Sequence, residues 1–458
     1  MGLGNPTVRP ASEPRGAGVA RRLASLAARL TYRDIEVVAL AEAPRGPAVL
    51  VSNHFGGLAD ALLLLHVSER FPRIVARDVI WRYPVAGPLM RWIGAIPVHR
   101  RADTPGAAPD NDAMFASCYA ALADRSQVLI FPEGVTQDDP FLAPVKTGAA
   151  RIALGARSAG TPGIEIQAVG IHYEDKAAFR SRVLVAFGDS LDIDTTAPSL
   201  PSDSPAAGPA DRAAVRALTD TVSHGMRQVA PDYHDWDQAH DLALAAQTTL
   251  RSVSPPASRA RGVPLAHSEP IAATLARLPS GLVNPVRAAA ARYRTHLASL
   301  RLTDATLATS STAETTVTPR TLTDLLLVVL LTPYALLGAA LGLVPYLLAQ
   351  ATRLIPASPA VRSTILPAVA LLVFLTEWVW LAAAAGRRDG WEAAAIVALL
   401  TPAFIAATVV VAERAVLTWR TLRRWWTSRR RTQHLSAARQ ARNDLVDAVT
   451  HALGQVKP

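Results

Sequence analysis

His54 and Asp60 are the two residues whose types and spacing best suit catalysis. A histidine takes up a proton near neutral pH, and a carboxylate on its second ring nitrogen fixes the tautomer and orientation of the imidazole. No serine or cysteine lies between the two residues. The pair therefore suggests a base that acts directly on a substrate hydroxyl, although a loop histidine followed by a helix-capping aspartate would give the same spacing.

The local sequence predicts a strand, a tight turn and a helix around this pair. Residues 48–52 have the composition of a strand, and the apolar run 61–65 has that of a helix. Gly56 and Gly57 lie between them and allow a tight backbone path. The predicted strand thus delivers a histidine to its end, and an aspartate opens the helix that follows.

Three further motifs could bind an anionic substrate: Gly94–Arg101, Val128–Thr136 and Pro144–Arg151. The first ends in Arg100 and Arg101, which could bind phosphate oxygens. The second ends with Glu133 and Gly134 in a tight turn. The third places Lys146 at a helix start, where the amide dipole suits an anion. Ligand sites gather where strands end in open α/β sheets, although Arg101 and Lys146 would also be ordinary as surface residues.

Short β-type runs alternate with helical runs over residues 34–195. This alternation is typical of an α/β domain with a central, mostly parallel sheet flanked by helices. The predicted strands are 48–52, 73–76, 95–98, 128–131, 165–169 and 183–187, and the predicted helices include 59–68, 112–124 and 148–159. The N-terminal segment 1–33 contains an Arg- and Leu-rich helical run, 21–30, that either lies on a membrane surface or packs on its own domain.

The rest of the chain divides by composition into three parts. Residues 196–320 form a linker and a helical region with a predicted break at 252–264. Residues 321–413 form an apolar membrane region. The tail 414–458 begins with a basic, Trp-containing segment of the kind found at a cytoplasmic interface.

Three apolar runs in the membrane region approach the length needed to cross roughly 30 Å of hydrocarbon. They are 325–349, 364–385 and 391–412. Three full crossings would put the basic tail opposite the soluble domain. We therefore expect two crossings, at 364–385 and 391–412, and a re-entrant or interfacial hairpin at 325–349, which Pro333 and Pro345 interrupt.

Composition narrows the class of partner. The formal net charge of +10 is compatible with nucleic acid, an anionic membrane surface or an anionic substrate. Zinc-finger spacing and RNP-type aromatic sequences are lacking, so we expect no nucleic acid partner. The single cysteine, Cys118, excludes an internal disulfide and a cysteine metal cluster. His54 and Asp60 have no third ligand at metal spacing, so we expect no metal.

Together these motifs resemble the glycerolipid acyltransferase family, which includes 1-acylglycerol-3-phosphate and glycerol-3-phosphate acyltransferases. The four blocks of the family are similar to Asn53–Asp60, Gly94–Arg100, Phe131–Gly134 and Ala168–Tyr173. The resemblance covers about residues 34–190. Two departures stand out. Five residues separate the histidine and aspartate where the family usually has four, a spacing similar to that of a glycerol-3-phosphate acyltransferase subgroup, and Ala168 replaces a frequent proline.

The resemblance implies a membrane-bound O-acyltransferase of phospholipid synthesis. It would use acyl-CoA or acyl carrier protein as co-substrate, without a resident cofactor, and would acylate a hydroxyl of glycerol 3-phosphate or lysophosphatidate. His54 would deprotonate that hydroxyl while Asp60 orients the imidazole. The residues that would position the acceptor are Arg100, Glu133 and Gly134, with Arg101 and Lys146 as further anion contacts. The protein would be multi-pass, with its catalytic domain facing the cytoplasm.

Other interpretations remain open at this point. The acceptor could be another lysolipid or an alcohol without phosphate. The chain could also be a non-catalytic membrane protein that keeps the fold to bind lipids, although the presence of His54, Asp60 and Glu133 favours an enzyme. A lipid transporter with an accessory domain is disfavoured by having only two or three apolar spans.

Overall fold

The computed structural model describes residues 13–84, 86–99, 111–136, 138–176, 178, 180–201, 208–254, 262–309, 319–351, 359–430 and 432–455. The chain divides into two compact units, 1–236 and 237–458. The predicted boundary between 195 and 196 falls inside the first unit, because helix α7 (Arg212–Val229) packs against the sheet.

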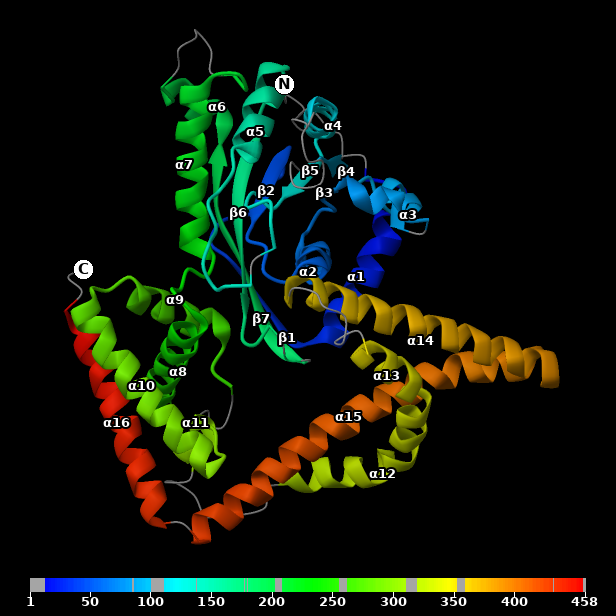
Figure 1. Ribbon diagram of the computed structural model, residues 1–458, viewed down its shortest axis with the longest axis vertical. Coiled ribbons are helices and arrows are strands. Elements are labelled where there is room, and N and C mark those ends of the chain that lie inside the picture. Colours follow the sequence, from blue (N-terminus) through cyan, green and yellow to red (C-terminus); the bar gives the residue numbers. More distant parts are fainter. Residues whose placement is uncertain are drawn as a thin grey trace, which may run out of the picture. The chain divides into compact units, whose positions relative to one another are not determined.

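The first unit is built on a seven-stranded sheet with the order β1-β7-β6-β2-β5-β3-β4 (Figure 1). The strands are β1 (Tyr32–Ala39), β2 (Ala48–Ser52), β3 (Arg73–Arg77), β4 (Ile96–Val98), β5 (Gln127–Ile130), β6 (Glu165–Tyr173) and β7 (Ser181–Asp192). Only β6 and β7 pair antiparallel, and the other neighbours are parallel. The predicted α/β domain with a mostly parallel sheet is confirmed.

Six of the seven strands were predicted, and β1 was not. Its sequence mixes charged residues such as Arg33, Asp34 and Glu36 with apolar ones, and most of its side chains are exposed or half-buried. This strand lies at the edge of the sheet and pairs only with β7. An edge strand needs no continuous apolar run, so its pattern was too weak to recognise.

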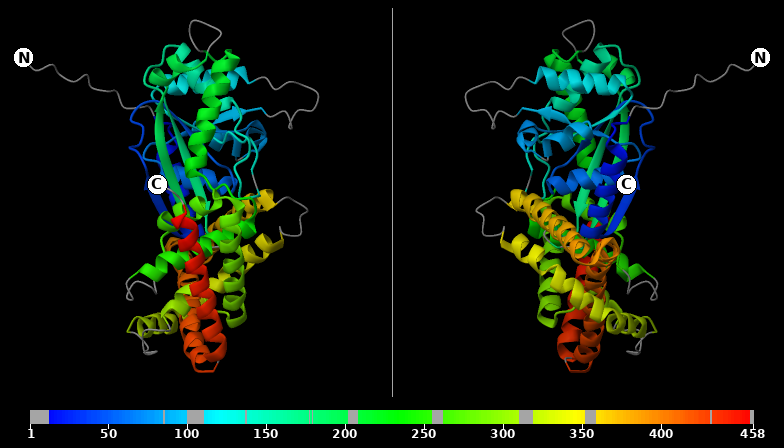
Figure 2. Two further views of the ribbon diagram at one scale, coloured as in Figure 1. Left: turned by 90° about the vertical axis from the view of Figure 1, so that its left-hand side faces the viewer. Right: turned by 90° about the vertical axis from the view of Figure 1, so that its right-hand side faces the viewer.

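Helices cover both faces of the sheet, because successive side chains of a strand point to opposite faces (Figures 1 and 2). On one face, Val49 and Val51 of β2 pack with α4 (Asp112–Ala123), α5 (Gly148–Ser158) and α7. On the other face, Leu50 packs with Leu63 and Leu64 of α2 (Leu58–Val67). The remaining elements on this unit are α1 (Ala17–Thr31), η1 (Asp78–Arg82), α3 (Ala86–Trp92), α6 (Ile193–Thr196) and η3 (Ala197–Ser199).

Helix α1 was predicted either to lie on a membrane surface or to pack on its own domain, and its two faces differ. Its small residues Ala17, Ala24 and Ala28 are buried against the domain, where α1 packs on α2. The larger side chains on its other face are exposed: Val19, Leu23, Leu26 and Leu30. The helix therefore packs on its own domain and also presents an apolar stripe to its surroundings.

The second unit begins with a helical bundle, as predicted for the region after the sheet. Its helices are α8 (Trp236–Val253), α9 (Leu265–Ala276), α10 (Ser280–Leu300), α11 (Asp304–Thr309) and, at the far end of the chain, α16 (Thr432–Gly454). Helices α10 and α16 pack on one another. Their buried side chains recur at helical spacing and include Val286, Tyr293 and Leu297 on α10 and Leu435, Leu445 and Val449 on α16.

The apolar region forms helices α12 (Pro319–Leu341), α13 (Leu343–Ala351), α14 (Pro359–Asp389) and α15 (Trp391–Arg430). Two stretches in the described residues are long and apolar enough to cross a membrane, Leu322–Leu341 and Trp391–Val416. The second contains the predicted crossing 391–412. The first lies in the run 325–349, for which a re-entrant or interfacial hairpin was predicted. Pro333 lies inside α12 without ending it, and the helix is broken between Leu341 and Leu343 instead. The predicted crossing 364–385 falls in α14, where the side chains of residues 359–371 lie outside those described.

Candidate active site

His54 and Asp60 form a hydrogen-bonded pair at the carboxyl end of β2. Nδ1 of the imidazole lies 2.9 Å from Oδ2 of Asp60. The His54 side chain is 13% exposed and that of Asp60 is fully buried. A carboxylate on Nδ1 favours the tautomer with its proton there, which leaves Nε2 to accept a proton from a substrate. Five residues separate His54 and Asp60 in sequence, where the family usually has four, and the two side chains are still in contact.

Three donors and a helix terminus hold the buried Asp60 carboxylate. Oδ2 accepts the Gly56 N–H at 2.8 Å besides the imidazole, and Oδ1 accepts the hydroxyl of Tyr173. Asp60 also lies in the first turn of α2, where the positive end of the helix dipole favours a negative charge. These contacts offset the cost of burying the charge and fix the orientation of the carboxylate.

The two glycines ahead of α2 are needed at their positions. Gly57 has a φ of +62°, which lies in the left-handed region that favours glycine. At Gly56 a Cβ atom would lie 2.5 Å from the Tyr173 hydroxyl and 2.8 Å from Oδ1 of Asp60. The tight path predicted for this pair thus brings the backbone against the carboxylate.

Strand register explains why His54 meets the Phe-Pro-Glu-Gly segment. β2 and β5 are parallel neighbours in which Val51 pairs with Ile130, so His54 and Glu133 both lie three residues beyond one paired position. Oε1 of Glu133 accepts the backbone N–H of His54 at 3.0 Å, and Oε2 accepts that of Ala143 at 3.4 Å. Glu133 therefore fixes the backbone that carries the candidate base.

Burial raises the pKa of Glu133 to about 7, against the opposing effect of the two backbone hydrogen bonds. Its side chain is 1% exposed. A carboxyl group this enclosed is neutral for part of the population near neutral pH. That Glu133 positions the acceptor stays a prediction, whereas its contact with the His54 backbone is direct.

Phe131 and Asn53 complete the frame around the imidazole. The Phe131 ring stacks on the His54 ring, with 4.0 Å between centroids and 20° between planes. Asn53 is fully buried and joins β2 to β6, because its Oδ1 accepts the Ile171 N–H at 2.8 Å and its Nδ2 donates to the Ile171 carbonyl at 3.1 Å. These contacts limit the rotation of the imidazole and of the loop that carries it.

Lys146 lies at the same edge of the sheet. A Cβ atom at Gly134 would be 2.5 Å from Nζ of Lys146, and the φ of +69° at Gly134 favours glycine. The Lys146 N–H donates to the Pro132 carbonyl at 3.0 Å, which ties the start of the α5 segment to the turn after β5. The structure thus brings Lys146, Gly134 and Glu133 together with His54. Arg100 and Arg101, predicted at the same edge, lie outside the described residues.

Sequence reasoning assigned no role to Tyr173, Phe131 or Asn53. All three lie within the blocks that carry the family resemblance, which was the available signal. Tyr173 ends β6, more than a hundred residues from Asp60, so its block did not indicate a contact with the carboxylate. Among the described residues no group of three or more His, Cys, Asp or Glu could hold a metal ion.

The chemistry of this arrangement is that of a general base without a protein nucleophile. The imidazole has one nitrogen on a carboxylate and the other available to a substrate. Lys146 supplies a cation at the same edge for an anionic group.

Comparisons with known proteins agree with this chemistry. Residues 34–172 match the Acyltransferase family. Glycerol-3-phosphate O-acyltransferase 2 of Saccharomyces cerevisiae is 34% identical over 150 residues, which are 32% of this chain and 18% of that protein. A lysophospholipid acyltransferase of Arabidopsis thaliana is 31% identical over 113 residues, 24% of this chain and 28% of that protein.

Glycerol-3-phosphate O-acyltransferase 1 of Saccharomyces cerevisiae is 31% identical over 130 residues, 28% of this chain and 16% of that protein. The chain thus spans less than a third of the length of each of these relatives. The crystal structure of the 1-acyl-sn-glycerophosphate acyltransferase PlsC from Thermotoga maritima aligns with a TM-score of 0.31 and 16% identity, over 46% of this chain and 78% of that chain. Residues 34–172, which carry His54, Asp60 and Glu133, are thus the part of the chain that matches the Acyltransferase family and is similar to glycerol-3-phosphate O-acyltransferases.

Proposed function

We propose that this protein transfers a fatty acyl group from a thioester to a hydroxyl of glycerol 3-phosphate or lysophosphatidate. The observation that carries the proposal is the 2.9 Å contact between Nδ1 of His54 and the buried Asp60 carboxylate. The donor is acyl-CoA or acyl carrier protein, which acts as a co-substrate, so the reaction needs no resident cofactor.

In the proposed reaction the acceptor hydroxyl attacks the thioester carbonyl. Nε2 of His54 takes the hydroxyl proton as the new C–O bond forms. The tetrahedral intermediate then collapses, the C–S bond breaks, and the proton passes to the departing thiolate. General-base assistance of this kind is worth roughly 10²–10⁴ in rate. Asp60 stays ionised and stabilises the imidazolium that forms between the two steps.

Two observations favour an acceptor with a phosphate group. Lys146 lies beside the turn that follows β5, and Arg100 and Arg101 are proposed to extend the same cationic edge. The names of two of the three relatives specify glycerol 3-phosphate. The five-residue spacing between His54 and Asp60 agrees with that choice. We therefore place glycerol 3-phosphate first and lysophosphatidate second.

Another lysolipid is the alternative acceptor, because one relative is named a lysophospholipid acyltransferase. Mass spectrometry of the products separates these cases. Membrane fractions that contain the protein are supplied with labelled acyl-CoA, or with acyl carrier protein, and with each acceptor in turn. We expect acylated glycerol 3-phosphate that depends on the protein and disappears in His54→Ala.

The control for this experiment is His224→Ala, an exposed histidine on α7 whose Nε2 lies 3.3 Å from Nε2 of Gln228 on the same helix. It should keep full activity. If His54→Ala acylates every acceptor as fast as the parent protein does, the proposed mechanism is wrong. If the parent protein acylates none of them, a non-catalytic lipid-binding role replaces it.

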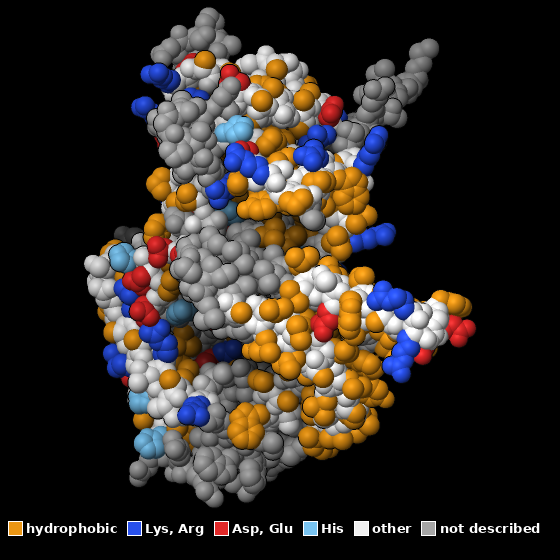
Figure 3. All heavy atoms as spheres, turned by 45° about the vertical axis from the view of Figure 1, so that its right-hand side comes forward, with side chains coloured by type: hydrophobic (Ala, Val, Ile, Leu, Met, Phe, Trp, Pro, Cys, Tyr) orange, Lys and Arg blue, Asp and Glu red, His pale blue; other side chains and the backbone are white. Residues whose placement is uncertain are grey.

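We further propose that residues 321–413 anchor the protein in a membrane. Large hydrophobic side chains of this region are exposed, and Figure 3 shows such side chains gathered over its surface. Examples are Leu326, Leu330 and Leu336 on α12, Val379 and Trp380 on α14, and Leu399 on α15. An exposed apolar surface of this extent is typical of a membrane-embedded part. The apolar stripe of α1 supports a membrane contact of the catalytic domain as well.

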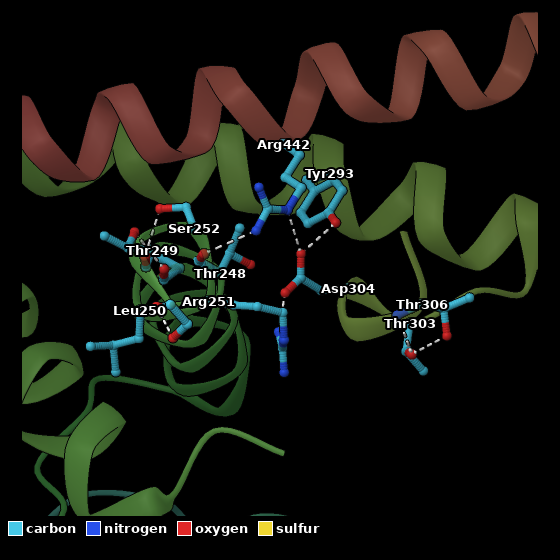
Figure 4. A network of polar contacts seen from close by, with 12 residues as sticks. Thr248, Thr249, Leu250, Arg251, Ser252, Tyr293, Thr303, Asp304, Thr306 and Arg442 are labelled. Carbon is cyan, nitrogen blue, oxygen red and sulfur yellow. Dashed lines mark hydrogen bonds and ion pairs between the residues drawn. The ribbon is translucent and has the colours of Figure 1, made fainter. Parts of the chain in front are cut away.

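A buried ionic network supports the proposal that both ends of this apolar region lie on the same side of the membrane (Figure 4). Asp304 lies on α11, before the apolar region, and Arg442 lies on α16, after that region. The Asp304 carboxylate accepts a hydrogen bond from Nε of Arg442 at 2.9 Å. Asp304 also pairs with Arg251 of α8 and accepts the Tyr293 hydroxyl at 2.7 Å. Charges packed in one folded bundle share one compartment, so the intervening chain crosses the membrane an even number of times.

The contacts of the two candidate crossings support a hairpin. Asp324 pairs with Arg414 at 2.5 Å, and the Thr408 hydroxyl donates to the Ala335 carbonyl at 2.8 Å. These pairs make α12 and α15 antiparallel. With the catalytic domain facing the cytoplasm, where acyl-CoA is available, both ends of the hairpin would face the cytoplasm too.

Cysteine labelling in sealed vesicles tests this topology. The only cysteine, Cys118, is buried, so Cys118→Ala provides a background for single reporters. Ala298→Cys on α10 and Ala437→Cys on α16 replace exposed residues. A membrane-impermeant maleimide should label both reporters equally in vesicles of one orientation, and permeabilisation should not change their ratio. Labelling of one reporter with protection of the other would overturn the proposal, as would recovery of the protein in the soluble fraction.

A further inference from the structure

We propose that Tyr173, backed by Tyr32, is a positioning residue that sets the orientation and basicity of the carboxylate behind His54. The inference rests on the proposed general-base function of His54 and extends it to residues that the four sequence blocks leave without a role. The geometry of the contact, its enclosure in the core and the direction of its hydrogen bond support this role.

The contact joins the end of β6 to the first turn of α2. The Tyr173 hydroxyl, at the end of β6, donates to Oδ1 of Asp60, the oxygen that His54 does not use. Tyr32 of β1 lies beside Tyr173, with 5.9 Å between the centroids of the two rings. The result is a line of contacts from Tyr32 through Tyr173 and Asp60 to His54.

This line of contacts is enclosed by the core. Tyr32 is a buried member of the cluster that joins α1, α2 and the sheet, and Tyr173 packs against the same cluster. Burial first, and then the negative charge of Asp60, hold the pKa of Tyr173 well above its usual value. Burial also raises the pKa of Tyr32. Both hydroxyls therefore stay protonated at any pH at which the enzyme works, and Tyr173 remains a donor.

A donor on Oδ1 makes the carboxylate a weaker base. Hydrogen bonds to the ionised form stabilise it and lower its affinity for a proton. With Tyr173 in place, Asp60 attracts the proton of His54 less strongly, which favours the neutral imidazole that acts as the base. Without this donor, the charge on Asp60 is less dispersed and favours the imidazolium.

Among the described residues, another titratable group faces the pair from a neighbouring element. Glu133, after β5, interacts electrostatically with both His54 and Asp60. Its two carboxylate oxygens bind the amides of His54 and Ala143. A change at Tyr173 therefore leaves the Glu133 contribution the same in the variant and in the parent protein, and the difference between their pH profiles reports on Tyr173.

The variant Tyr173→Phe removes the hydroxyl and keeps the ring. The quantity to measure is kcat/KM for acyl transfer by the full-length protein between pH 5.5 and 9. Loss of a hydrogen bond to a charged group predicts about a tenfold drop near neutral pH. The acid limb of the profile should move to higher pH, so that the deficit shrinks as the pH rises. Tyr32→Phe removes the hydroxyl of the tyrosine beside Tyr173. This variant should shift the acid limb of the profile in the same direction by a smaller amount.

Tyr119→Phe is the matched control. Its hydroxyl reaches the Arg151 carbonyl at 3.5 Å on α5, away from the pair, so its profile should follow that of the parent protein. A drop in activity with an unshifted acid limb in both Tyr173→Phe and Tyr32→Phe would assign these tyrosines a purely structural role and overturn the inference. That result leaves the proposed function standing, whereas full activity of His54→Ala would contradict the function itself.

Discussion

The backbone N–H of His54 donates to Oε1 of Glu133 at 3.0 Å, although the two residues are 79 positions apart. The contact follows from the parallel register of β2 and β5, in which both residues lie three positions past one pair. The catalytic loop and the Phe-Pro-Glu-Gly turn are thus fastened to each other at the sheet edge. The candidate base takes its position from this contact as much as from Asp60.

The buried carboxyl of Glu133 predicts a pH-dependent stability. Burial raises its pKa to about 7 from 4.5, so the folded protein binds this proton more tightly than the unfolded chain does. The stabilisation amounts to about 3 kcal/mol at most, is full below pH 4.5 and is lost as the pH rises through 7. The thermal midpoint of the parent protein should therefore fall between pH 5 and 7, and that of Glu133→Gln should fall less.

The control for this titration is Glu174→Gln. Glu174 pairs with Arg182 at 2.8 Å, and its pKa is lowered, with burial opposed by the Arg182 hydrogen bond and charge. Its contribution is present above pH 4.5 and is lost only below it. Between pH 5 and 7 the variant should run parallel to the parent protein. Equal pH dependence of Glu133→Gln and the parent protein would show that Glu133 does not titrate in this range.

A methyl group at Gly56 should disrupt the pair. The Cβ atom of Gly56→Ala would lie 2.5 Å from the Tyr173 hydroxyl and 2.8 Å from Oδ1 of Asp60, so one of these groups must move. We expect kcat to fall by roughly tenfold to a hundredfold, because small displacements of catalytic groups are costly. Gly18→Ala on α1 is the matched control, since nothing lies within 4 Å of its Cβ position. Wild-type kcat in Gly56→Ala would show that this loop relaxes freely.

Lys146 should affect the acceptor rather than the chemical step. Lys146→Gln removes a cation beside Gly134 and is expected to raise KM for glycerol 3-phosphate about tenfold, as for one charge-assisted hydrogen bond. The value of kcat should change little, because the base and its carboxylate are untouched. An acceptor alcohol without phosphate provides the control and should show no change in KM. A similar loss for both acceptors would exclude a phosphate contact.

The C-terminal helix should depend on Arg442. Arg442→Ala removes a guanidinium whose Nε lies 2.9 Å from the buried Asp304. Breaking one arm of a buried ionic network typically costs about 3 kcal/mol. The thermal midpoint of the purified protein should drop by several degrees. Gln440→Ala is on the exposed face of the same helix. It should change the free energy of unfolding by no more than about 0.5 kcal/mol. Equal midpoints for the two variants would mean that Asp304 is held without Arg442.

The parts of the site that were predictable from sequence lie where local patterns end. His54 and Glu133 each follow a short apolar strand, and parallel strands bring their carboxyl ends to one edge. Tyr173 was not predictable in this way, because its contact with Asp60 depends on how far β6 extends and on the face to which its last residue points. The stacking of Phe131 on His54 likewise depends on side-chain packing, which spacing alone does not encode.

The fold shows the same division. The strands buried on both faces, such as β2 and β5, have continuous apolar sequences and were found. The edge strand β1 was missed because half of its side chains face solvent. In the second unit, helicity was evident from composition, but the packing of α16 onto α10 joins segments separated by the whole apolar region and needed the structure.

A double-mutant cycle on His54 and Asp60 tests most directly whether the two act as one base. The measurement is kcat/KM for acyl transfer to glycerol 3-phosphate by the parent protein, His54→Ala, Asp60→Asn and the double variant. If Asp60 works through the imidazole, His54→Ala should lower kcat/KM by roughly 10²–10⁴. Adding Asp60→Asn to that variant should then lower kcat/KM very little. Losses that multiply in the double variant, or a single variant as active as the parent protein, would contradict the account.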